Sequence, residues 1–383
     1  TAVQIEKKSK RSVTLVLAAI SMASFLSIGV LQIIHPAPNT RPNGFERDIV
    51  TDVLGQKKTV ELPDNNYYFA GFEGDSVYLG NYNSRLHLLV SDIGLADTQH
   101  HRLKIFQGES YLFNNLLLRV SPPYFYLSDG SIPATFRGKI NEWVAYRFMP
   151  NRSFFIEQSP LSEGAFVNRL TLDSSHGQAL ALETADGSLR INSTLLQRQL
   201  DGHFCVEGRL HVNPENRTII YVYTYRNGFF VTDSNLNLLH RHETIDTNKT
   251  AKLEIAVQGS LGSASLALAS PPFPVNASSC ADSGLVFVQS ALKADNEGNR
   301  LFRNRVPVDV YNEDDGSYVH SFHLPHREIK QFQVRGRKIL VLADRSLFIY
   351  EYSKRPESGF QHRKSGETDR KPVEKSRSPL FHH

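Results

Sequence analysis

The chain has 383 residues, of which 40% are hydrophobic, and this composition is typical of a folded protein rather than a wholly disordered one. Its 43 basic and 39 acidic residues give a formal charge of +4, which is too balanced to indicate a nucleic-acid-binding domain. The two cysteines do not form a Cys-x-x-Cys pair, which excludes a disulfide-rich scaffold and a thiolate zinc site.

The N-terminal part contains an apolar segment, Ser12–Ile34, without a charged side chain. As a helix at about 1.5 Å per residue, it is long enough to cross a bilayer. The basic residues just before it predict a cytoplasmic N-terminus and a main domain in the periplasm or outside the cell; they are Lys7, Lys8, Lys10 and Arg11. We therefore predict an uncleaved signal anchor at residues 12–34. A cleaved signal peptide and a buried helix are the alternatives.

The remaining boundaries follow from composition. Residues 1–11 form the basic cytoplasmic end, and residues 35–55, with Pro36, Pro38 and Pro42, are predicted to be an extended tether. Residues 354–383 are charged and almost free of apolar side chains, which predicts a disordered basic tail. The folded domain is therefore expected at residues 56–353.

That domain contains a recurring pair of strands. Asp75–Asp92 reads as an apolar strand, a polar turn and a second apolar strand. The pattern recurs at irregular intervals of roughly 40–65 residues, as expected for four-stranded propeller blades. The later copies are Tyr124–Phe136, Ala179–Ile191, Ile219–Val231, Leu285–Val310 with a long loop, and Ile339–Tyr350. Six copies predict an all-β, six-bladed β-propeller; treating Lys249–Pro274 as an extra blade gives a seven-bladed alternative.

The two ends of the domain complement each other. The last copy is followed directly by the charged tail, so its blade lacks a fourth strand. The strand predicted at Lys58–Leu62 has no partner before the first blade. Pairing it with the final blade supplies the missing strand and removes an exposed sheet edge. We therefore expect the N-terminal strand to close the ring.

In strand count and hairpin form, residues Gln56–Tyr352 resemble the six-bladed β-propellers of the broad TolB-like and NHL-like group. This resemblance implies a membrane-anchored propeller on a bacterial envelope protein. It carries no family signature and therefore no catalytic residues.

One residue type recurs at the same place in four copies. Arginine stands where the second strand of the hairpin begins, at Arg85, Arg226, Arg305 and Arg345. On a propeller, these turns are expected around the mouth of the central channel, where guanidinium groups would bind carboxylate, phosphate or sulfated ligands. Ordinary solvated arginines beside turns are the alternative.

Other candidates are weaker. Cys205 and Cys280 are compatible with one disulfide in an oxidising compartment or with two separate buried thiols. His320, His323 and His326 resemble a metal cluster, but strand alternation points the first two to opposite faces, so we predict no metal site. The sequence contains no recognisable nucleophile elbow, phosphate loop or dinucleotide fingerprint, and it identifies no cofactor.

Together these patterns predict a single-pass membrane protein whose extracytoplasmic propeller binds an envelope protein or an anionic ligand. Nucleic acid is not an expected partner. An enzyme working at the channel mouth, such as a hydrolase, lyase or quinoprotein-like oxidoreductase, and a structural subunit of a membrane complex are the alternatives. Whether the protein is an enzyme is left open by the sequence.

Overall fold

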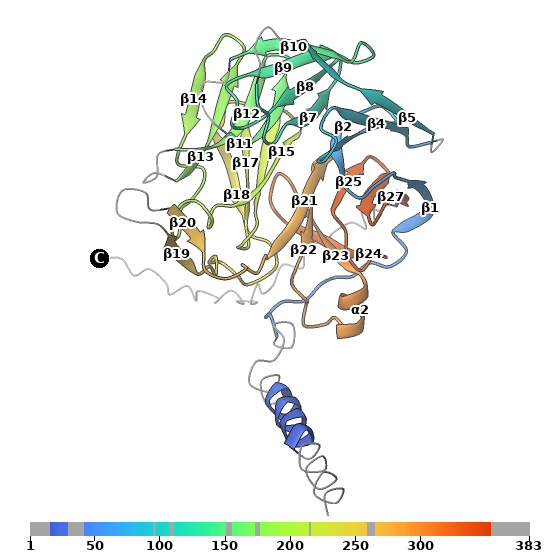
Figure 1. Ribbon diagram of the computed structural model, residues 1–383, viewed down its shortest axis with the longest axis vertical. Coiled ribbons are helices and arrows are strands. Elements are labelled where there is room, and N and C mark those ends of the chain that lie inside the picture. The colour runs from blue at the N-terminus through green and yellow to red at the C-terminus, as the bar shows by residue number, and fades with distance from the viewer. Residues whose placement is uncertain are drawn as a thin grey trace, which may run out of the picture.

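A computed structural model describes residues 16–29, 42–94, 97–106, 111–150, 155–172, 177–213, 216–258 and 265–353. These residues form an all-β domain preceded by a separate helix (Figure 1). The predicted basic end at 1–11 and the tail at 354–383 lie outside the described residues. The helix covers residues 16–29 within the predicted anchor. In the described part of the chain, no helix combines the length and the apolar character needed to cross a membrane.

The domain is built from repeated four-stranded antiparallel units. Two of them share one nine-stranded sheet. The first consists of β2 (Tyr67–Glu73), β3 (Ser76–Asn81), β4 (His87–Asp92) and β5 (Thr98–Arg102). The second consists of β7 (Leu117–Ser121), β8 (Tyr124–Ser128), β9 (Thr135–Lys139) and β10 (Val144–Met149), with the short β6 (Lys104–Phe106) beside β10.

This nine-stranded sheet curls until it is nearly closed. Its edge strands, β5 and β6, are separated in the chain by Leu103 alone, and Leu103 is buried. The two units meet through one parallel pair, Gly71 with Val120. A β-carbon on Gly71 would lie 2.2 Å from the carbonyl oxygen of Val120, so this junction requires glycine.

Three further units are separate four-stranded sheets. One comprises β11 (Phe155–Ser162), β12 (Ala165–Thr171), β13 (Gln178–Thr184) and β14 (Leu189–Asn192). The next comprises β15 (Gly208–Asn213), β16 (Thr218–Tyr223), β17 (Phe229–Asp233) and β18 (Leu238–His242). The third comprises β21 (Asn276–Asp282), β22 (Leu285–Ser290), β23 (Val306–Asn312) and β24 (Tyr318–Leu324), with helix α2 (Asn299–Asn304) between β22 and β23.

The last unit joins the two ends of the domain. It contains β25 (Gln331–Arg335), β26 (Lys338–Ala343), β27 (Ser346–Tyr352) and, at its edge, β1 (Leu54–Glu61). β1 pairs antiparallel with β27, so that Lys58 faces Ile349. This confirms the pairing predicted for Lys58–Leu62. Val60 and Leu62 are buried beside Leu347 and Ile349, because closing the sheet removes their apolar side chains from water.

The first strands of the six units contact one another in chain order. β2 contacts β7, β7 contacts β11, β11 contacts β15, β15 contacts β21, β21 contacts β25, and β25 contacts β2. The cycle is therefore complete. The apolar cores are shared between the strands of each unit and between neighbouring units, as in the cluster that contains Phe287, Phe322 and Tyr352.

Two sequence predictions are corrected by the strand positions. Ala179–Ile191 was expected to hold the same place in its unit as the other copies of the hairpin, which form second and third strands, but β13 and β14 are the third and fourth. The strand before them, β11, contains Pro160 and polar side chains that conceal its alternation. The alternative seventh blade at Lys249–Pro274 contains only one two-stranded hairpin within the described residues, β19 (Ile255–Gln258) and β20 (Ser265–Leu268).

Candidate functional site

The first strands of the six units enclose a central cavity of about 280 Å³. Each unit contributes at least one residue from its first strand, because these strands contact one another around the cavity. The polar lining residues are Tyr68, Tyr82, Arg119, Glu157, Ser159, Arg169, Arg209, His211, Ser278, Ser279, Lys330, Gln331 and Gln333. The cavity is therefore a polar site at the centre of the domain.

The charge of the cavity is predominantly positive. Arg119, Arg169, Arg209 and Lys330 line it, and among the described lining residues Glu157 is the single acid. Because the walls are protein rather than water, opposite charges attract more strongly here than on an open surface. The lining is therefore suited to a negatively charged ligand.

The guanidinium group of Arg169 is held by side chains of the same chain. Its Nη1 lies 2.8 Å from Oε2 of Glu207, its Nη2 lies 3.1 Å from Oε1 of the same carboxylate, and its Nη1 also donates to Gln178 at 3.1 Å. Its Nε lies 3.7 Å from Glu157. Such a bidentate pair fixes the guanidinium group in place. Arg169 thus supplies charge to the cavity while its position is held by the protein.

Arg119 and Arg209 retain donor capacity. Arg119 lies 5.9 Å over the ring of Tyr68, and its Nη1 donates to the carbonyl oxygen of Leu118 at 3.3 Å. Arg209 is exposed and forms no ion pair within the described part of the chain. A guanidinium group has five N–H donors in a planar fork. Both side chains can therefore donate to a ligand oxygen in the cavity.

Two titratable groups in the cavity are shifted toward their neutral forms. Burial raises the pKa of Glu157, although the charges of Arg169, Arg119 and Arg209 act in the opposite direction. Burial, with a smaller contribution from Arg209, lowers the pKa of His211 to about 4. His211 is therefore neutral at pH 7, and its Nε2 shares a hydrogen bond of 2.8 Å with the hydroxyl group of Ser279.

The four predicted arginines lie at the expected places in the chain, just before the third strand of their units. However, none of them lines the central cavity. Arg85 donates to the Phe113 carbonyl at 2.9 Å, and Arg345 donates to the Pro63 carbonyl. Each guanidinium group is therefore tied to a neighbouring loop.

Arg226 and Arg305 have different surroundings. Arg226 is buried, stacks 3.7 Å over the ring of Tyr223 and donates to the Gln197 carbonyl at 3.1 Å. Arg305 follows α2 and is exposed. The structure does not bring the four together, because turns between the second and third strands lie one strand away from the innermost strand of each sheet.

The arginines that do line the cavity come from first and second strands. Arg119 is flanked by buried Leu118 and Val120 in β7, and Arg209 precedes buried Leu210 in β15. A charged residue next to buried apolar residues of a first strand was the available signal, because side chains alternate and such a residue faces away from the apolar core.

The remaining candidates do not form sites. Cys205 and Cys280 are free, buried thiols in different core clusters, so the disulfide is not formed. His320 lies 3.4 Å from the Tyr352 hydroxyl, His323 pairs with Glu297, and His326 lies 2.8 Å from the Tyr350 hydroxyl. The three histidines thus have separate partners, and the described residues contain no cluster of metal-ligating side chains.

Comparison with known proteins adds information on the fold. No protein-family model matches the chain, and no curated protein matches it. A solved structure of a DUF4221 family member from Bacteroides vulgatus aligns over 80% of this chain and 99% of its own, with 13% identity and a TM-score of 0.54. The two share a fold.

A luciferin-regenerating enzyme aligns with 8% identity and a TM-score of 0.45, over 77% of this chain and 95% of its own. U3-55K aligns with 9% identity and a TM-score of 0.42, over 77% and 98%. Neither supports a functional argument at this distance.

Proposed function

We propose that this chain is a membrane-anchored, six-bladed β-propeller whose central cavity binds a small anionic ligand. Four observations support the propeller: the six four-stranded units, the closed cycle of contacts between their first strands, the pairing of β1 with β27, and the fold shared with the DUF4221 structure. Pairing β1 with β27 covers the edge that β27 would otherwise expose, and the radial arrangement of a propeller leaves only short, protected strand edges.

The anchor is proposed from the apolar segment at residues 12–34. Within it, the helix at residues 16–29 exposes large apolar side chains, among them Phe25, which is 76% exposed, and Met22, which is 68% exposed. Leaving such side chains in water costs free energy, and a bilayer removes that cost. The basic residues before the segment support a cytoplasmic N-terminus and an extracytoplasmic propeller.

The proposed binding function depends on the arginine side chains that line the central cavity. Arg119 and Arg209 face it with unused donors, while Arg169 is fixed beside them by Glu207. Carboxylate, phosphate and sulfate groups match the planar fork of arginine. Hydroxyl and amide groups from Ser278, Ser279, Gln331 and Gln333 surround the charges and would orient a hydroxylated anion.

The test uses the full-length chain in mild detergent and isothermal titration calorimetry. Citrate, phosphate and sulfate are the anionic probes, and glycerol is the neutral control. We expect at least one anion to bind and the double variant Arg119→Gln/Arg209→Gln to weaken that binding by more than tenfold. Arg102→Gln, on the exposed strand β5, is the matched control and should bind as the parent does. Equal binding by parent and double variant would refute the proposal.

A protein partner is the second candidate, and a different surface favours it. Phe106 and Tyr146 are 67% and 53% exposed, with ring centroids 5.5 Å apart on the neighbouring strands β6 and β10. Beside them, Arg137 lies between the rings of Tyr124 and Phe148, at 4.3 and 3.8 Å. Aromatic residues and arginine are enriched in the energetic centres of protein interfaces.

This second candidate is tested by affinity purification of the full-length chain from its native membrane in mild detergent. We expect a reproducible partner that Phe106→Ser/Tyr146→Ser no longer retains. Loss of the partner from the Leu238→Ser/Leu239→Ser control, which alters two other exposed apolar side chains, would argue against a specific role for this surface.

A further inference from the structure

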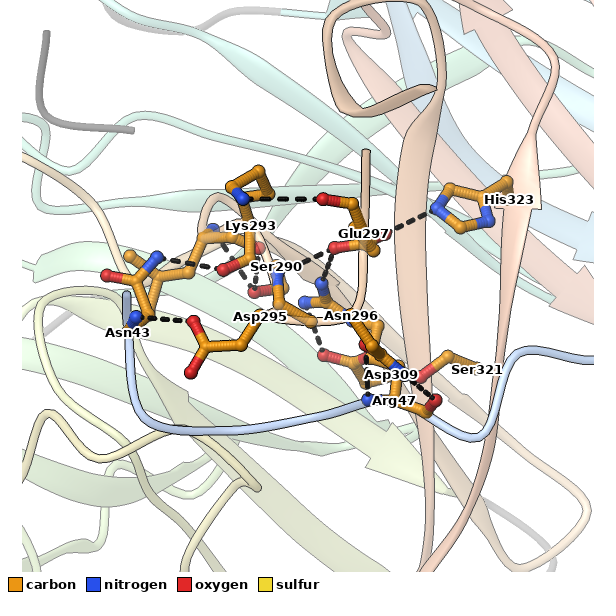
Figure 2. Close-up of polar contacts among 12 residues, drawn as sticks. Asn43, Arg47, Ser290, Lys293, Asp295, Asn296, Glu297, Asp309, Ser321 and His323 are labelled. Atoms are coloured by element: carbon orange, nitrogen blue, oxygen red, sulfur yellow. Dashed lines mark hydrogen bonds and ion pairs between the residues drawn. The ribbon is translucent and has the colours of Figure 1, made fainter. Parts of the chain in front are cut away.

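The chain enters the folded domain through a polar cluster whose ion pairs are buried. The backbone amides of Asn43 and Gly44 donate to the two carboxylate oxygens of Asp295, at 2.7 and 2.9 Å. Arg47 is bidentate to Asp309, at 2.7 and 3.1 Å, and its Nη1 also contacts Glu297 (Figure 2). We call Asn43, Arg47, Asp295, Glu297 and Asp309 the clasp.

The clasp also fixes the loop that leads into α2. Glu297 accepts a hydrogen bond from the Ala294 amide at 2.7 Å and pairs with Nε2 of His323 at 2.6 Å. Burial raises the pKa of Glu297, but the hydrogen bond with His323 and the charge of Arg47 outweigh this effect and lower the pKa overall. The carboxylate is therefore charged at neutral pH. Because α2 begins at Asn299, its position is coupled to the point where the chain enters the domain.

The surface beside the clasp is strongly basic. Arg300, Arg303 and Arg327, together with Asn299 and Asn304, line an open hollow of about 620 Å³. We call these five residues the α2 basic surface. Its three arginines are exposed, and within the described ranges none of them forms an ion pair. Arg305 lies directly after α2, and Glu328 is the adjacent acid. The positive charge here is therefore largely uncompensated.

The length of chain between the anchor and the clasp places this surface near a membrane. Residues 35–42 separate the apolar segment from Asn43. Eight residues span at most about 28 Å even when fully extended. Attraction between exposed charges acts over roughly 8–10 Å at physiological salt, so a modest approach of the domain brings its arginines within range of lipid phosphates.

We infer that the α2 basic surface docks onto anionic phospholipid headgroups of the bilayer that holds the anchor. This inference rests on the membrane anchoring proposed above. Arginine binds phosphate through paired N–H donors, and exposed basic residues close to an anionic leaflet are attracted to it. Docking would fix the orientation of the domain, because the clasp leaves α2 little freedom relative to the point of entry.

The experiment places a fluorescent reporter on the surface of the full-length chain. Both native cysteines are buried, so Asn299→Cys can be labelled selectively with bimane. The labelled chain is inserted into nanodiscs of phosphatidylcholine with a headgroup nitroxide lipid, with or without about one third phosphatidylglycerol. We expect at least twofold stronger quenching with the anionic lipid, and loss of that increase in 0.5 M salt.

Two charge-matched triple variants complete the experiment. The variant Arg300→Gln/Arg303→Gln/Arg327→Gln removes the charge of the α2 basic surface and should abolish the increase in quenching. The variant Arg102→Gln/Lys104→Gln/Lys139→Gln removes exposed charges elsewhere and should keep the increase. Equal quenching in both lipids, or equal loss in both variants, would overturn docking and leave the anchor intact. Failure of the chain to co-purify with nanodiscs of either lipid would overturn the anchor and docking together.

Discussion

Removal of the Arg47 side chain tests how strongly the clasp stabilises the domain. The side chains of Arg47 and Glu297 are fully buried, and that of Asp309 is 4% exposed. Arg47→Ala therefore leaves two buried carboxylates without their cation. Breaking a buried ion pair in this way costs about 3–5 kcal/mol. At about 2–4 °C per kcal/mol, the range for domains of about 150–250 residues, we expect the melting temperature to fall by roughly 6–20 °C.

The assay is thermal unfolding of the full-length chain followed by circular dichroism, with the double-mutant cycle of Arg47→Ala and Asp309→Ala. The double variant should be less destabilised than the sum of the two single variants, because removing one partner also removes the need for the other. Arg190→Ala, which removes an exposed arginine, should change stability by less than about 0.5 kcal/mol. A loss for Arg47→Ala no larger than that of the control would refute a stabilising clasp.

Three further predictions follow from the fold and the cavity. Gly71→Ala should destabilise the domain by about 2 kcal/mol or more in urea unfolding, because its β-carbon would collide with backbone across the nine-stranded sheet. Gly298→Ala, whose added β-carbon would meet nothing within 4 Å, should cost less. Burial lowers the pKa of His211 to about 4 in the folded chain, below its ordinary value near 6.5. Between pH 6.5 and 4 the unfolded chain therefore binds more protons than the folded chain. The free energy of unfolding should consequently fall as the pH drops from 6.5 to 4. His211→Asn should flatten that part of the urea-derived stability curve by about 1–3 kcal/mol, and an unchanged slope would contradict the assignment. Cys205 and Cys280 should react with a thiol reagent only after denaturation, and the melting temperature should not respond to reductant, since both thiols are buried and unpaired.

The hairpins were predictable because their information is local. Alternating apolar residues and a polar turn mark β3 with β4, β16 with β17, and β26 with β27 without reference to the rest of the chain. β11 was missed because Pro160 and several polar residues interrupt that alternation, and the structure compensates by pairing it with β12. The hairpin Ala179–Ile191 was therefore assigned to the second and third strands of its unit instead of the third and fourth.

The candidate site was less predictable than the strands. The recurring turn arginines were a genuine periodic feature, but Arg85 and Arg345 use their guanidinium groups to hold neighbouring loops. The guanidinium groups of the cavity come from Arg119, Arg169 and Arg209, which occupy different positions in their units. A periodicity search cannot detect them, because convergence at the centre depends on where each strand lies in its sheet.

The sequence by itself determined the all-β class, the repeated hairpins and the pairing of an unmatched N-terminal strand with the last unit. Each of these depends on side-chain alternation or on a strand left without a partner, and both are readable along the chain. Only the tertiary structure decided which charged side chains face the central cavity and that Arg47 is buried against Glu297 and Asp309, about 250 residues away. Such contacts depend on the packing of distant segments, and burial then determines whether a charge stabilises the fold or remains available to a ligand.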